Sequence, residues 1–328
     1  MLFESLILAS ALYMSTSTTN ATPITDNPTY TLSETNFAAE PTASFPYDMT
    51  YPYAYFELDE VLNNVSGLAP SRDPKSITCI QNDDGKAYLL DKKTGKVMSS
   101  VFFITEGQFE GIEMVGDTMF AMKDNGQLYK IWNLNGAHKT VKQVKMNLPR
   151  TEMMAGLGYD LQRNRLLITA KGQKDGEFSK KIYEFDVKTN KSNPIPAYEI
   201  TLAQFKEFLA DKKADKNYQK TYEDFVSKGN TKNFDFSPSS IAVNPLDNNI
   251  YVLSAMNNVL MVMNAQGKIL EINKLKKDMH ISPNGLCFDE EGTMYITNEA
   301  KDGRPAKLVE YKVSKTALTA SRANTARK

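Results

Sequence analysis

The chain has 328 residues, of which 41% are hydrophobic and 24% are charged, and its 39 Lys and Arg balance 39 Asp and Glu. This composition is that of a globular protein with a sizeable core, in one large domain or two ordinary ones. A net charge of zero argues against nucleic-acid binding, which needs an excess of basic residues on one face.

The first residues have the pattern of an export signal. A short apolar run over residues 6–14 is followed by small polar residues ending in Thr19-Asn20-Ala21, although Glu4 stands where a positive charge is usual. The run is shorter than the roughly 20 apolar residues that a bilayer span requires. We therefore expect a signal peptide over residues 1–21 and an extracytoplasmic location, either periplasmic or secreted.

Two segments are too polar to order themselves. Residues 22–50 are rich in Thr, Pro, Ser and Asn, and residues 316–328 are small, polar and basic. Such compositions cannot bury enough apolar surface to offset the entropy of ordering. We expect a flexible linker over 22–50, a disordered tail over 316–328, and the folded domain over 51–315.

Five segments of this domain begin alike. They are Val65-Ser66-Gly67-Leu68-Ala69, Phe109-Glu110-Gly111-Ile112-Glu113, Met154-Ala155-Gly156-Leu157-Gly158, Pro238-Ser239-Ser240-Ile241-Ala242 and Pro283-Asn284-Gly285-Leu286-Cys287. Their second positions lie 44, 45, 84 and 45 residues apart, so one period holds with a single long insertion. A period of about 40–50 residues with four strands in each unit is typical of a β-propeller.

Alternating apolar strands and Gly or Asn turns within each unit indicate four-stranded antiparallel sheets. We predict an all-β fold, a five-bladed β-propeller, with a six-bladed TolB-like ring as the alternative if the insertion supplied a blade. The fifth unit lacks its outermost strand, and residues 53–58 form a strand without a unit. This N-terminal strand is expected to close the ring by pairing with the fifth blade, which covers two exposed edges at once.

The insertion, residues 201–233, lies between the third and fourth blades and has a helical pattern. Thr201 and Gln204 form a capping box, and a first apolar face follows. A second helix with its own aromatic residues is expected before Gly229. The helices either serve as a lid or partner-binding pair, or simply pack their apolar stripe on the propeller.

The best candidate site is one mouth of the central channel. The innermost strand of each blade starts there, and the loops between second and third strands open on the same face. The strand starts bring Ser66, Glu110, Ala155, Ser239 and Asn284 into a ring, and the loops add Asp83, Asp84, Asp124, Asn298 and Glu299. Loops carried by a rigid scaffold are common binding sites. The predicted binding residues are Ser66, Glu110, Ser239, Asn284, Asn298 and Glu299.

These motifs resemble the SdiA-regulated family, the YjiK-like propellers related to NHL repeats. The resemblance covers residues 56–315 and rests on the order and spacing of the strand starts, residues 81–85, residues 156–160 and residues 295–299. It implies a five-bladed, exported or membrane-associated protein of unknown biochemical role. It also implies a calcium ion on the propeller and a role in protein interaction.

The calcium ligands implied by this resemblance would be Glu110, Asn284 and Glu299. Family members carry Glu at ring positions where this chain has Ala155 and Asn284, so the site has lost acidic groups. Calcium prefers six to eight oxygen ligands, usually with several carboxylates. Alternatively, Glu110 and Glu299 are polar groups of the mouth that bond to backbone amides and water.

The leading hypothesis is a non-catalytic binding module that recognises a protein or an envelope component through this face. No nucleophile-elbow, P-loop or paired-histidine motif occurs in the sequence. The alternative is a calcium-dependent hydrolase like the lactonase and phytase propellers, with His280 as a possible base. A third possibility is a structural module that displays the insertion helices.

The two cysteines, Cys79 and Cys287, have no metal-binding spacing. They are expected to be buried thiols that act as small apolar residues, and a disulfide between them is the alternative.

Overall fold

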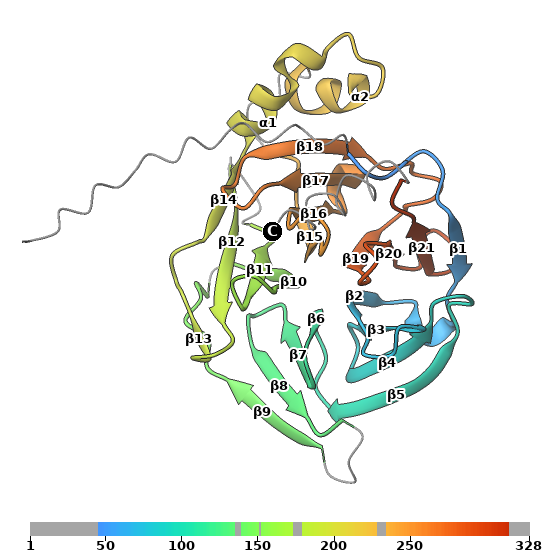
Figure 1. The fold of residues 1–328 in the computed structure, drawn as a ribbon, viewed down its shortest axis with the longest axis vertical. Coiled ribbons are helices and arrows are strands. Elements are labelled where there is room, and N and C mark those ends of the chain that lie inside the picture. Colours follow the sequence, from blue (N-terminus) through green and yellow to red (C-terminus); the bar gives the residue numbers. More distant parts are fainter. Residues whose placement is uncertain (1–44, 135–138, 151, 173–178, 228–233, 315–328) are drawn as a thin grey trace, which may run out of the picture. The chain divides into compact units, whose positions relative to one another are not determined.

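Short apolar strands separated by tight turns form five antiparallel sheets around a central axis in the computed structural model (Figure 1). The structure describes residues 45–134, 139–150, 152–172, 179–227 and 234–314, all within one unit, Ala43–Lys328. The predicted signal peptide, residues 22–44 of the predicted linker and the predicted tail lie outside the described residues. The prediction of a five-bladed propeller is confirmed.

Each blade contains four strand positions, numbered from the axis outward. Blade 1 consists of β2 (Val65–Pro70), β3 (Ser76–Gln81), β4 (Gly85–Asp91) and β5 (Val97–Ile104). Blade 2 consists of β6 (Phe109–Val115), β7 (Thr118–Lys123), β8 (Leu128–Trp132) and β9 (Thr140–Val144). Blade 4 consists of β15 (Pro238–Val243), β16 (Ile250–Ser254), β17 (Val259–Met263) and β18 (Ile269–Lys274).

Blade 3 has a divided outer strand. Its inner strands are β10 (Met154–Asp160), β11 (Arg165–Ala170) and β12 (Ser179–Asp186). Two short strands, β13 (Lys191–Ser192) and β14 (Tyr198–Thr201), pair with opposite ends of β12. The chain therefore leaves this blade at Thr201, directly into the insertion.

Blade 5 is completed by the N-terminal strand, as predicted. It contains β19 (Pro283–Phe288), β20 (Met294–Asn298), β21 (Lys307–Tyr311) and, on the outside, β1 (Ala54–Glu57). β1 runs antiparallel to β21, with Ala54 opposite Glu310 and Glu57 opposite Lys307. A short 3-10 turn, η1 (Glu60–Leu62), then leads into blade 1.

The predicted linker does not extend to residue 50. Tyr47 is 5% exposed and Met49 is 9% exposed, and both lie in the core between blades 4 and 5. The Tyr47 hydroxyl donates to the carbonyl oxygen of Gly292 at 2.7 Å. The composition of residues 22–50 does not reveal this burial, because two large apolar side chains suffice to dock a short polar segment.

The insertion packs on the propeller, as one of the two interpretations expected. Its elements are α1 (Leu202–Leu209), η2 (Ala210–Lys212), α2 (Gln219–Tyr222) and a π-helical turn, η3 (Glu223–Ser227). A further 3-10 turn, η4 (Met256–Asn258), lies outside the insertion, between β16 and β17 of blade 4. The capping box between Thr201 and Gln204 forms. Phe205 and Leu209 are fully buried in a core shared with blades 3 and 4. The helices lie outside β18, at the rim of the ring (Figure 1).

The blades meet where their innermost strands come into backbone contact. The residue after each ring position is Gly in blades 1, 2, 3 and 5. A Cβ on Gly156 would lie 2.5 Å from the Cα of Ser240, and one on Gly67 would lie 3.0 Å from the amide nitrogen of Ile112. The glycines are thus required by the distance between blades and not by an unusual φ. In blade 4, Ser240 takes this place and its hydroxyl accepts the amide hydrogen of Leu286 in the next blade at 3.0 Å.

The cysteines are both free and buried in the core between blades 5 and 1. This confirms the expectation of buried thiols, and burial raises the pKa of both. Within the part of the chain that the structure describes, no helix has the length and apolar character needed to cross a bilayer.

Gly156→Ala is predicted to destabilise the propeller by about 3 kcal/mol or more, because its methyl group would overlap backbone atoms that cannot move away. Urea unfolding measures the change. Gly116→Asn is the control, since Gly116 has a φ of 56° in a turn with no atom within 4 Å of an added Cβ, and Asn tolerates this conformation. Equal stability of the two variants would contradict the requirement for close inner strands.

Candidate functional site

The predicted ring positions occupy the same structural place in every blade. Each lies at the start of an innermost strand where the pairing register shifts, for example between Val65 and Gly67 and between Phe109 and Gly111. Such a bulge leaves one residue outside the ladder and redirects its side chain. The sequence repeat therefore marks five bulges as well as five strands.

The two ring serines join neighbouring blades. The Ser66 hydroxyl donates to the carbonyl oxygen of Phe109 in blade 2 at 2.6 Å. The Ser239 hydroxyl makes the equivalent bond to the carbonyl oxygen of Pro283 in blade 5 at 2.9 Å. Both side chains are buried. Their first role is therefore to hold the ring together, since each closes a buried hydrogen bond between blades.

A second ring lies at the residue that follows the second strand of each blade. Its members are Asn82, Asp124, Lys171, Ala255 and Glu299. Of these, Asp124 and Glu299 are site residues predicted from the sequence, and Asn82 and Lys171 are not. Their place directly after the second strand was the available signal, because that register repeats in every unit.

Glu110 and Lys171 form the central ion pair of the mouth. The Lys171 ammonium lies 2.9 Å from Oε2 of Glu110, and the Asn82 amide donates to Oε1 at 3.4 Å. The Glu110 side chain is 10% exposed. Burial raises the pKa of Glu110, Lys171 opposes this, and the charges of Glu299 and Asp124 add to the rise. Glu299 and Asp124 therefore lie close enough to Glu110 to act on its carboxyl group electrostatically.

The Glu299 carboxylate, like that of Glu110, accepts hydrogen bonds from two side chains. Its Oε1 accepts from the Asn284 amide at 2.5 Å, and its Oε2 accepts from the Ser282 hydroxyl at 3.0 Å. Its amide nitrogen donates to the carbonyl oxygen of Ser282 at 3.0 Å. The structure thus brings Glu110, Asn284 and Glu299 to one mouth, with their polar groups already engaged.

Asn298 and His280 lie in the core beside the mouth. Asn298 is 2% exposed, and its amide donates to Nδ1 of His280 at 3.3 Å. The other ring nitrogen, Nε2, lies 2.7 Å from the Tyr311 hydroxyl. Burial lowers the pKa of His280 to about 4. The imidazole is therefore neutral at pH 7, fully buried and bonded at both nitrogens, which makes it a core residue.

The residues present fit an internal ion pair better than calcium. All four carboxylate oxygens of Glu110 and Glu299 accept hydrogen bonds from side chains. Lys171 already supplies a positive charge, and Ala155 offers no side-chain oxygen. Calcium would require six to eight oxygens, and therefore the displacement of these donors. Across residues 45–314, apart from the gaps named above, no group of three His, Cys, Asp or Glu residues could hold a metal ion.

A second acidic group lies deeper, three residues after Glu110 on β6. Glu113 is 6% exposed, and its two oxygens accept the amide hydrogens of Met114 at 2.8 Å and of Tyr159 in blade 3 at 2.9 Å. Burial raises the pKa of Glu113 to about 8, against the two backbone hydrogen bonds. Its carboxyl group is therefore largely protonated at neutral pH.

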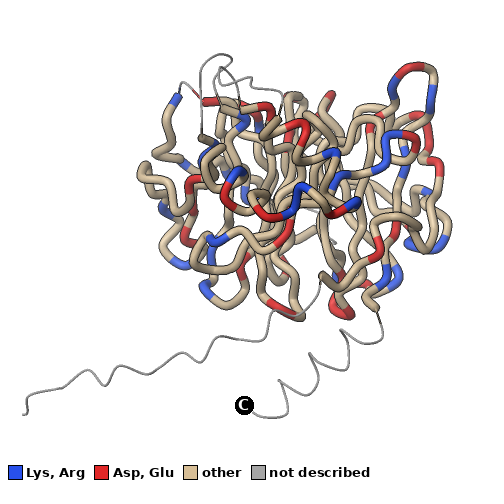
Figure 2. The backbone as a smooth tube through the Cα atoms, turned by 90° about the horizontal axis from the view of Figure 1, so that it is seen from above, with Lys and Arg blue, Asp and Glu red and all other residues tan. Residues whose placement is uncertain are grey.

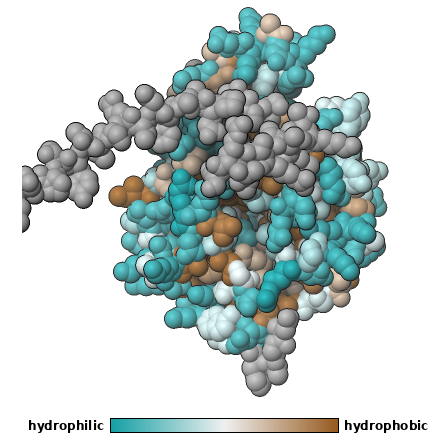
Figure 3. Space-filling view, in the orientation of Figure 1, coloured by the Kyte–Doolittle hydropathy of each residue, from teal (hydrophilic) through white to brown (hydrophobic). Residues whose placement is uncertain are grey.

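The surface charges do not form a single-sign face. Lys and Arg alternate with Asp and Glu along the described backbone (Figure 2). On the face shown in Figure 3, hydrophilic residues dominate the periphery, and apolar residues are visible mostly nearer the middle. At the mouth itself, Glu110 and Lys171 form a charge pair.

Comparison with known protein families shows to which family this chain belongs. The profile of the SdiA-regulated family matches residues 49–301. The chain belongs to the SdiA-regulated family. The match includes all five ring positions, so the resemblance inferred from the strand starts is confirmed. A search of curated protein sequences found no significant match.

Several solved structures are similar to this member of the SdiA-regulated family. A glutaminyl cyclase from Myxococcus xanthus has 10% identity and a TM-score of 0.49, covering 80% of this chain and 96% of its own. A PQQ-bound aldose sugar dehydrogenase from Streptomyces coelicolor has 11% identity and a TM-score of 0.47, covering 80% and 100%. A nidogen/laminin complex has 14% identity and a TM-score of 0.42, covering 71% and 72%. Similarity at these levels says nothing about function.

The raised pKa of Glu113 predicts a pH dependence of stability. The folded protein holds a proton that the unfolded chain, with a pKa near 4.5, releases. Stability therefore falls as the pH rises from about 4.5 to 8, by an amount on the order of 4 kcal/mol. Glu113→Gln should remove this slope, at a pH-independent cost of about 1 kcal/mol, because its amide nitrogen cannot accept one of the backbone hydrogens.

Urea unfolding of both proteins between pH 5 and 8.5 measures this difference, and contributions from other groups cancel between them. Parallel pH curves for the wild type and Glu113→Gln would show that Glu113 does not titrate in this range.

Proposed function

We propose that this chain is a non-catalytic binding propeller that recognises a protein or an envelope component at the mouth of its channel. The observation that carries the proposal is the hydrogen bonding of the two carboxylates at the mouth. Glu110 and Glu299 are each fixed by two side-chain donors from neighbouring segments. A rigid polar surface of this kind suits hydrogen-bond recognition of a partner, since little side-chain entropy is lost on binding.

The calcium-dependent hydrolase is the less supported alternative. It would need Glu110, Asn284 and Glu299 as metal ligands and His280 as a base. The three ligands are engaged with each other and with Lys171, and His280 is bonded to Asn298 and Tyr311. We therefore propose that Lys171 supplies at the mouth the positive charge that calcium would otherwise bring.

The proposed location is outside the cytoplasm. Its support is the export pattern of residues 1–21, which lie outside the described residues. A partner at the cell envelope is consistent with that location.

Removing Lys171 is predicted to create a weak calcium site. Wild-type protein should show no change in melting temperature with calcium, whereas Lys171→Gln frees an oxygen of Glu110 and should bind calcium in the millimolar range. At ten times the Kd, stabilisation is about 1.4 kcal/mol and the melting temperature rises by about 3 °C.

Calorimetry and thermal melts test this, with Lys142→Gln as the control because Lys142 is exposed on β9. Saturable calcium binding by the wild type that is lost in Glu110→Gln would instead support the metal site and reopen the hydrolase alternative.

Partner recognition at the mouth is predicted to be specific to one face. A photo-crosslinking amino acid at Asp83, which is exposed beside the mouth, should capture a discrete partner in cells that make the protein. The same group at Asp117, in the exposed turn between β6 and β7 at the opposite end of β6, should not. Equal labelling from both positions, or none from Asp83, would contradict the proposed binding face.

A further inference from the structure

The outer edge of blade 5 carries an unusual concentration of exposed aromatic rings. Among the described residues, the aromatic side chains that are more than a third exposed are Tyr51 at 73%, Tyr53 at 70%, Tyr55 at 53% and Phe102 at 49%. The three tyrosines stand at alternate positions of one segment, in which Tyr51 and Tyr53 lie at bends and only Tyr55 lies in β1. We call these residues, with the lysines described next, the tyrosine strip.

Each ring of the tyrosine strip has a lysine ammonium over it. Lys276 lies 4.7 Å from the ring centroid of Tyr51. Lys312 lies 5.2 Å from that of Tyr53, and Lys307 lies 5.4 Å from that of Tyr55. These cation–π contacts hold the rings in place from one side.

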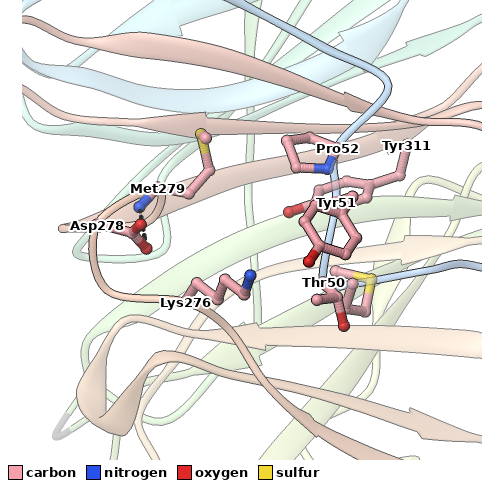
Figure 4. A pocket seen from close by; sticks show the side chains of 8 residues that line it. Thr50, Tyr51, Pro52, Lys276, Asp278, Met279 and Tyr311 are labelled. Carbon is pink, nitrogen blue, oxygen red and sulfur yellow. Dashed lines mark hydrogen bonds between the residues drawn. The ribbon is translucent and has the colours of Figure 1, made fainter.

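A small pocket lies at the N-terminal end of the strip. It has a volume of about 220 Å³ and is lined by Met49, Thr50, Tyr51, Pro52, Lys276, Asp278, Met279 and Tyr311. Figure 4 shows the side chain of Lys276 extended toward Tyr51 across this pocket, with Asp278 and Met279 on the Lys276 side. The pocket therefore combines an aromatic ring with a cation and a carboxylate.

The charge of the strip is not fully compensated by its surroundings. Lys312 pairs with Glu310 at 2.5 Å, whereas Lys276 and Lys307 have no carboxylate partner within 4.0 Å among the residues that the structure describes. The nearby Asp278 accepts a backbone amide hydrogen at 3.1 Å. Two ammonium groups therefore remain available to an anionic ligand.

The lysines alone have a second explanation, because charged residues commonly protect an edge strand such as β1 against pairing with other chains. That explanation does not account for three tyrosine rings kept more than half exposed beside them. The core of a protein–protein interface is depleted in charged residues, whereas here a lysine accompanies every ring. A single-stranded nucleic acid would need a continuous basic groove, whereas Glu310 and Asp278 stand among the lysines of the strip.

We propose that the tyrosine strip binds an acidic linear polysaccharide. The apolar faces of sugar rings stack on tyrosine rings, and carboxylates of the sugars pair with Lys276 and Lys307. The three exposed rings follow one another along the chain from residue 51 to residue 55, so the strip offers more than one contact to a chain molecule. This site lies on the outer wall and is independent of the mouth.

Isothermal titration with oligogalacturonate tests the proposal, and the fully methyl-esterified oligosaccharide serves as the matched neutral ligand. Wild-type protein should bind the acid form, and binding should weaken with salt because ion pairs contribute. Tyr53→Ala with Tyr55→Ala should weaken binding by about tenfold or more, and Lys307→Gln by several-fold. Tyr53 and Tyr55 are exposed and Lys307 is partly exposed, so thermal melts should show unchanged folding.

Phe102→Ala, which removes an exposed aromatic ring from β5 of blade 1, is the matched control and should leave binding unchanged. Glu110→Gln should also leave it unchanged, which separates this site from the mouth. The proposal is overturned by a wild type that binds neither ligand, by equal binding of the acid and its ester, or by tyrosine variants that bind as well as the wild type. Stronger binding of oligothymidylate would assign the strip to nucleic acid instead.

Discussion

The close approach of the innermost strands is the constraint on which this propeller depends. An added Cβ would lie 2.5 Å from the backbone of the next blade at Gly156, and 3.0 Å from a backbone nitrogen of the next blade at Gly67 and at Gly111. The residues at these positions are therefore small, with Gly in four blades and Ser240 in blade 4. The bulge beside each glycine then turns the preceding residue out of the ladder. The same geometry that closes the ring therefore also creates the mouth.

The mouth consequently serves two purposes at once. Ser66 and Ser239 use their hydroxyl groups to connect blades, whereas Glu110 and Asn284 present polar groups at the same position in other blades. Substitution within one repeated position thus gives some blades a hydroxyl group that connects them and others a carboxylate or an amide at the mouth. Lys171 completes the arrangement by balancing the buried carboxylate of Glu110, because an uncompensated charge at this depth would be costly.

The outer wall of the propeller is built differently from the mouth. Between blades 3 and 4 the wall is covered by α1 and α2, with Phe205 buried and Phe208 and Tyr222 partly buried against the same core. At blade 5 the last strand is supplied by β1, and its exposed face keeps Tyr53 and Tyr55 in contact with lysines. One part of the rim is therefore sealed by an insertion, and another is left as a polar and aromatic surface. The two parts of the rim thus differ in how much aromatic surface they expose.

The sequence by itself determined the number of blades, the closing strand, the capping box of the insertion and the ring positions. Those features depend on local periodicity and on spacing of about 45 residues, which a single chain displays directly. It could not reveal that Lys171 would meet Glu110, that Asn298 would turn to His280, or that Tyr47 and Met49 would be buried. Those contacts join segments far apart in the chain, so only the tertiary structure, with the distances set by ring closure, decided them.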